Sequence, residues 1–113
     1  MAQSSHLRND ARSLMLHKAI AQKLRASPDP VLSLARQNLQ RWQDDEGASY
    51  YAREWATLLN GPLDRLLAVL VEEGEYAVAL RHMTPFAGAL TPQERWTIYR
   101  AFREAWPFAS RGV

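Results

Sequence analysis

The sequence contains no cysteine. This absence excludes a disulfide framework, a cysteine nucleophile and every metal site that is built on thiolates. No apolar run approaches the ~18 residues of a membrane span, because the richest stretch, Leu66 to Val71, is followed directly by Glu72 and Glu73. The segment Met1 to Asp10 is polar and lacks the apolar stretch of a secretory signal. We therefore expect a cytoplasmic protein that does not enter a membrane.

Motifs of catalysis and of metal binding are also missing. The chain has five glycines and no glycine-rich phosphate loop, and it has no His-Glu-x-x-His sequence or serine nucleophile elbow. Two of the three histidines, His6 and His17, would lie ~16 Å apart along a helix, which is too far to share a metal ion. The acidic clusters at Asp44–Glu46 and Glu72–Glu75 are typical of solvated turns and helix ends. We therefore predict that the chain is not an enzyme and that it holds no metal or cofactor.

Each part of the chain has an excess of charge of one sign. Residues 1–41 hold seven Lys/Arg against two Asp/Glu, residues 42–75 hold two against eight, and residues 76–113 hold five against two. Such an uneven pattern can steer a charged partner. The alternative is that the blocks mix on the surface once the chain folds.

The positions of proline and of capping residues in the sequence favour helices. Proline is favoured at the first position of a helix, where its missing N–H would be unpaired anyway. Asp29-Pro30 and Gly61-Pro62 fit this rule, and Thr91-Pro92-Gln93-Glu94 has the pattern of a capping box. No segment has the alternation of a strand bounded by hairpin turns. With 113 residues and 47% hydrophobic residues, we predict an all-α fold, a compact single-domain bundle of five or six helices with short connections.

Apolar residues at helical spacing give the expected bounds of these helices. The helices are predicted to run from about Leu7 to Leu24, from Pro30 to Trp42, from Ala48 to Leu59, from Pro62 to Val71, from Glu75 to His82 and from Pro92 to Ala105. Asp44–Gly47 should form a turn, and Pro107 should end the last helix. The domain should span residues 1–113, with residues 1–5 and 108–113 frayed.

Most aromatic residues at helical spacing are expected in the core. We predict that Trp55 and Trp96 are buried and that Trp42 and Trp106 could lie either in the core or on the surface. Asn38 lies within an apolar stripe, and a buried amide must be hydrogen-bonded. It is therefore either a tie to a nearby backbone, which we favour, or part of a recognition surface.

The segment Arg81–Gly88 combines a proline, an aromatic residue and a glycine between two helices. It is expected to be a packed corner, with Phe86 filling the core and Gly88 supplying an unusual backbone angle. Loops that are held on a rigid scaffold often carry a binding site. Arg81 and Arg95, on either side of the Pro-Phe-Ala-Gly sequence, could form an anion site. A weaker alternative is an enzyme site assembled from Arg81, His82, Arg95 and Tyr99.

Three stretches resemble signature sequences of small helical bacterial proteins associated with toxin–antitoxin-type modules and helix-turn-helix regulators. These stretches are Asn38-Leu39-Gln40-Arg41-Trp42, Pro85-Phe86-Ala87-Gly88-Ala89-Leu90 and Glu94-Arg95-Trp96. The similarity spans roughly residues 10–104, and it departs from the usual pattern at His82-Met83-Thr84. It implies an antitoxin-like role that depends on binding a partner, and it implies no catalytic residue.

Two binding hypotheses follow. The first is a regulatory module that binds a protein, possibly one encoded by a neighbouring gene, with candidate contact residues Asn38, Arg41, Trp42, Arg81, His82, Phe86 and Arg95. The second is a nucleic-acid-binding regulator whose basic first helix contacts phosphates through Arg8, Arg12, Lys18, Lys23 and Arg25. The sequence does not predict the oligomeric state.

Overall fold

Six helices account for most of the chain in a computed structural model, which describes the backbone of residues 2–43 and 49–111 and the side chains of residues 7–42 and 50–106. The helices are α1 (Ala2–Ala26), α2 (Pro28–Gln43), α3 (Ser49–Asn60), α4 (Leu63–Val71), α5 (Glu75–His82) and α6 (Pro92–Arg111). The described residues contain no strand. The predicted all-α single-domain bundle is confirmed.

The hydrophobic core is formed by α1 to α5 and by the segment between α5 and α6. Trp55 is fully buried at its centre, and the other large side chains without exposure include Leu24, Leu66, Leu70 and Phe86. The predicted burial of Trp55 is confirmed. Helix α1 packs along α4, and α2 packs along α3, so two helix pairs enclose this core.

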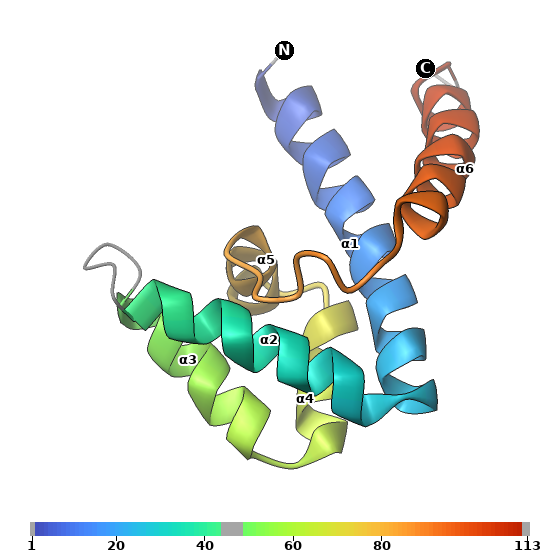
Figure 1. Ribbon diagram of the computed structural model, residues 1–113. Helices are drawn as coiled ribbons and strands as arrows, with labels where there is room; N and C mark the ends of the chain where they lie inside the picture. The colour runs from blue at the N-terminus through green and yellow to red at the C-terminus, as the bar shows by residue number, and fades with distance from the viewer. Residues whose placement is uncertain (1, 44–48, 112–113) are drawn as a thin grey trace.

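Helix α6 stands apart from that core. Its main packing partner is α1, and Phe102 is the only buried residue among its described side chains. Figure 1 shows α6 and the first half of α1 projecting from the same side of the body, with both chain termini at that end. Residues 84–90, which we call the corner, cross from α5 to the start of α6 (Figure 1).

The predicted start of the second helix was two residues late. Helix α2 begins at Pro28, directly after Ser27, and Pro30 lies within its first turn. The first four N–H groups of a helix have no partner inside the helix, so neither proline removes a hydrogen bond there. Pro28, and not Pro30, therefore marks the start of α2.

The predicted end of the last helix was wrong. Helix α6 continues past Pro107 to Arg111. A single proline removes one backbone hydrogen bond and can bend a helix without ending it. The expected turn at Asp44–Gly47 lies outside the described residues, as do Met1 and residues 112–113 of the ends that were expected to fray.

The predicted burial of Trp96 was also wrong, because 55% of this side chain is exposed. Leu7 and Leu63, two further apolar residues within helices, are exposed as well. Helical periodicity identifies an apolar face but does not show whether another element covers it. At Trp96 no part of the core does, because α6 packs mainly on α1.

Candidate functional site

The corner 84–90 is held to α2 by a buried amide. Asn38 donates from Nδ2 to the backbone oxygens of Pro85 and Ala87, at 2.8 and 3.0 Å. Arg41, one turn further along α2, donates to Oδ1 of Asn38. The interpretation of Asn38 as a tie to a nearby backbone is confirmed, and both N–H groups of the amide are used within the fold.

A second tie joins the corner to α1 through His17. Nδ1 of His17 lies 2.7 Å from the backbone oxygen of Ser13, and its Nε2 lies 2.9 Å from Oγ1 of Thr84. A backbone oxygen can only accept, so Nδ1 carries the proton and Nε2 accepts from the Thr84 hydroxyl. The Thr84 oxygen in turn accepts from the N–H of Phe86 at 3.2 Å. Every polar atom of this chain of hydrogen bonds is therefore used.

Burial keeps the His17 imidazole neutral. Only 3% of the residue is exposed, and desolvation lowers its pKa from 6.5 to about 4, with a smaller contribution in the same direction from the charge of Arg81 and an opposing one from the hydrogen bond to Ser13. At the level of the sequence, His17 is a candidate only for metal binding. Its position three residues from both Leu14 and Ile20, on the apolar face of α1, was a signal of a buried and hydrogen-bonded group.

The corner also contributes to the hydrophobic core. Phe86 is buried and meets the Trp55 ring edge-on, with ring centroids 5.7 Å apart. Gly88 has a φ of +88°, in the left-handed region that favours glycine. The predicted roles of Phe86 and Gly88 in a packed corner are both confirmed.

Arg81 and His82, the last two residues of α5, contact other helices of the fold. Arg81 is buried and donates from Nη1 to the backbone oxygens of Val69 and Leu70, at 3.1 and 3.5 Å, so it satisfies the end of α4. His82 is exposed, and its Nε2 lies 2.7 Å from Oδ1 of Asp10 on α1. Each residue thus links α5 to a different helix.

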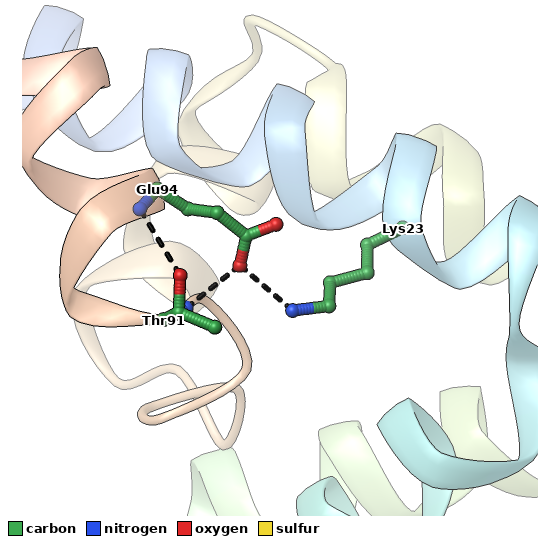
Figure 2. Close-up of polar contacts among 3 residues, drawn as sticks. All are labelled: Lys23, Thr91 and Glu94. Atoms are coloured by element: carbon green, nitrogen blue, oxygen red, sulfur yellow. Dashed lines mark hydrogen bonds and ion pairs between the residues drawn. The ribbon is translucent and has the colours of Figure 1, made fainter.

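The start of α6 is fixed by the predicted capping box, which is confirmed. The Thr91 N–H donates to Oε1 of Glu94 at 2.7 Å, and the Glu94 N–H donates to Oγ1 of Thr91 at 3.1 Å. Figure 2 shows that Lys23 of α1 reaches the same carboxylate oxygen, at 2.8 Å. The hydrogen bond from Lys23 and those from Thr91 lower the pKa of Glu94. One carboxylate therefore caps α6 and ties it to α1.

A cavity of about 180 Å³ lies between α1, the corner and α6. Its apolar lining comes from Leu16, Ile20, Phe86, Ala87, Gly88 and Leu90. Its polar lining comes from His17, Thr84, Arg95 and Tyr99, and no acidic residue lines it. The cavity is thus apolar at most points, with its charged group at Arg95.

Arginine–aromatic contacts run along α1 and α6. The guanidinium of Arg8 lies 5.4 Å from the centroid of the Phe102 ring, and that of Arg12 lies 5.7 Å from the Tyr99 ring. Within α6, Arg103 lies 5.9 Å from the exposed Trp96 ring. Each contact is within the range of a cation–π interaction. Trp96 and Arg103 are seven residues apart and so share one face of α6.

The candidate partner-binding residues differ in how far they are exposed. Asn38, Phe86 and Arg81 are buried and have structural contacts, as described above. Trp42 is partly buried against the core. Arg41, His82 and Arg95 are exposed, but they do not gather in one cavity, since only Arg95 lines the one beside the corner.

The candidate nucleic-acid-binding residues of α1 also differ in their contacts. Arg8 and Arg12 stack on aromatic rings of α6, and Lys23 pairs with Glu94. Lys18 and Arg25 are exposed and seven residues apart, so they share one face of α1. Of the five candidates, Arg8, Lys18 and Arg25 are exposed, and Lys18 and Arg25 lie on one face.

The described residues contain no group of three or more His, Asp or Glu side chains placed to hold a metal ion. His6 lies outside the described side chains. The weaker enzyme hypothesis needs Arg81 and His82 beside Arg95 and Tyr99, but neither of the first two lines the cavity that the last two share. None of the helices in the described part of the chain has the length and apolar character to cross a membrane.

Comparison of the chain with protein-family models, with curated proteins and with solved structures found no match.

Proposed function

We propose that the chain is an antitoxin-like or regulatory module that binds a protein partner on α6. The observation that carries this proposal is the exposed Trp96, which lies beside Arg103 on a helix outside the hydrophobic core. Tryptophan and arginine are the residue types most enriched among those that dominate binding energy at interfaces.

The buried polar residues favour a binding function over a catalytic one. The buried polar residues His17, Asn38 and Arg81 all have hydrogen-bond partners within the fold. No described buried side-chain nitrogen or oxygen lacks a partner. The resemblance of Asn38–Trp42 and Pro85–Leu90 to antitoxin-type proteins supports the regulatory part of the proposal, and the absence of cysteine fits a cytoplasmic location.

The direct test is co-expression with the product of each neighbouring reading frame, followed by size-exclusion chromatography. We expect one of these products to co-elute with the chain in a stoichiometric complex. Trp96→Ala should disrupt the complex, and Tyr50→Ala, which truncates an equally exposed aromatic residue on α3, should leave it intact. A chain that elutes alone with every neighbouring product would contradict a neighbour-encoded partner.

A second candidate function is nucleic-acid binding through α1. The exposed pair Lys18 and Arg25 favours it, and phosphate contacts would make the affinity fall steeply with salt. Fluorescence polarisation with a labelled DNA duplex at two salt concentrations tests it. Binding that is lost at high salt and weakened by Lys18→Gln supports this function, and the absence of binding at low salt removes it.

A further inference from the structure

We propose that the cavity between α1, the corner and α6 binds a carboxylate that is carried on a compact apolar group. The apolar half of this ligand follows from the lining. Leu16 and Ile20 line the cavity from α1, and Phe86 and Leu90 line it from the corner. A volume of about 180 Å³ is on the order of the ~150 Å³ apolar cavities that take up benzene. The cavity therefore accepts a group about the size of one aromatic ring.

The anionic half follows from which polar groups remain available. His17 and Thr84 line the cavity, but they are committed to each other and to the backbone of Ser13 and Phe86. The remaining polar lining is the guanidinium of Arg95, which only donates, and the phenol of Tyr99. A carboxylate provides the acceptors that this pair requires.

The surrounding charges reinforce this preference. No acidic residue lines the cavity, and the nearest acidic neighbour in sequence, Glu94, is held by Thr91 and Lys23. The guanidinium of Arg12 lies over the Tyr99 ring and adds positive charge on the α1 side. Phenylacetate combines the required ring and carboxylate. The same chemistry occurs at the end of a peptide chain whose last residue is phenylalanine.

The site does not depend on the proposed protein partner, because it is formed within one chain. A titration of the full chain with phenylacetate, followed by ¹H–¹⁵N correlation spectra, tests it. We expect saturable shifts that centre on the amides of residues 84–90 and 95–99. The neutral isostere phenylacetamide should bind at least about tenfold more weakly, since a guanidinium forms stronger hydrogen bonds with a charged carboxylate than with a neutral amide.

Variants on α6 provide the matched comparison. Arg95 and Arg100 are both exposed, so neither change should unfold the chain. Arg95→Gln should weaken phenylacetate binding about tenfold or more, and Tyr99→Phe should weaken it several-fold. Arg100→Gln removes the same charge outside the cavity lining and should leave binding within about twofold of the unchanged protein.

The source of the ligand is distinguished by a third probe, acetyl-Gly-Gly-Phe with a free or an amidated terminus. Tighter binding of the free-acid peptide than of phenylacetate identifies a chain terminus, and binding of phenylacetate alone identifies a small acid. Both results support the site. Equal binding of phenylacetate and phenylacetamide, equal loss in Arg95→Gln and Arg100→Gln, or no saturable shift at the corner would overturn the proposal.

Discussion

Two buried polar side chains, His17 and Asn38, connect the corner to helices far away in the sequence. His17 is 67 residues from Thr84, and Asn38 is 47 residues from Pro85. Burying such groups costs free energy unless they are hydrogen-bonded, and here they are. They fix the corner, and the corner in turn places Phe86 against Trp55.

The neutral state of His17 predicts a dependence of stability on pH. In the unfolded chain the pKa is about 6.5, and in the folded chain it is about 4. Only the unfolded chain therefore takes up this proton between those values, so the stability is complete above pH 6.5 and falls as the pH approaches 4. The free energy of unfolding should decrease by up to about 3 kcal/mol from this group.

Chemical denaturation at steps of pH measures this decrease. His17→Gln is the comparison, because it removes the titrating group while the carboxylates of the chain still titrate. The difference in unfolding free energy between the two proteins should change across pH 6.5 to 4. A constant difference would show that His17 is not held neutral by the fold.

Removal of the Asn38 amide should destabilise the protein strongly. Asn38→Ala leaves the carbonyl groups of Pro85 and Ala87 without their donor, and we expect a loss of about 2–3 kcal/mol in the free energy of unfolding. Asn60→Ala, at an exposed position, should cost less than about 0.5 kcal/mol. Urea denaturation of both variants measures the two losses, and similar values would argue against the tie.

At the scale of elements, α6 differs from the other helices in how it is attached. It contributes no residue to the cluster of buried core side chains, although Ile98 packs against that cluster. It is fixed instead by its capping box, by Lys23, and by the stacking of Arg8 and Arg12 on its rings. These contacts lie at the surface, where solvent screens the ion pair, so each contributes little to stability.

The capping box should therefore control the stability of α6 locally. Thr91→Ala removes the acceptor for the Glu94 N–H and should destabilise the start of α6 by about 1 kcal/mol. Thr97→Ala, two turns into the same helix, should change little, because its hydroxyl only bonds back to the backbone of Gln93. Hydrogen exchange of the α6 amides reports both effects, and equal protection in the two variants would contradict this role of the cap.

At the scale of the whole molecule, the protein is a packed body from which an arm projects. The arm consists of α6 and the first half of α1. Its dimensions are 43 × 30 × 23 Å and its radius of gyration is 14.7 Å, compared with the ~13 Å of a compact domain of this length. Figure 1 shows the cause, since α6 and the first half of α1 extend beyond the other helices. The face of α6 that α1 does not cover is therefore exposed for binding.

This arrangement predicts that stability is uneven across the fold. Amide hydrogens of α6 should exchange at least about tenfold faster than those of α4, whose Leu66, Val69 and Leu70 are fully buried or nearly so. Binding of a partner on α6 should slow exchange there and leave α4 unchanged. Uniform protection across both helices would show that α6 belongs to the cooperative core.

The sequence predicted the helices well and the arm poorly, for a physical reason. Caps and periodicity are local, so Thr91–Glu94, Trp55 and the Gly88 conformation were all predictable. Whether a helix face is covered depends on the arrangement of distant elements, so the exposure of Trp96 was not. The contact of His17 with Thr84 joins α1 to the corner, and that of Arg81 with Val69 joins α5 to α4. Both leave no local pattern beyond a polar residue on an apolar face.

The central claim, that the chain acts by binding a protein on α6, is tested most directly by the dissociation constant of the isolated complex. Isothermal titration calorimetry should compare the unchanged chain with Trp96→Ala and Tyr50→Ala. We predict that Trp96→Ala raises Kd by about thirtyfold or more, which corresponds to a hot-spot loss of ~2 kcal/mol, and that Tyr50→Ala changes it by less than about twofold. A Trp96→Ala chain that binds its partner as tightly as the unchanged chain would contradict the account.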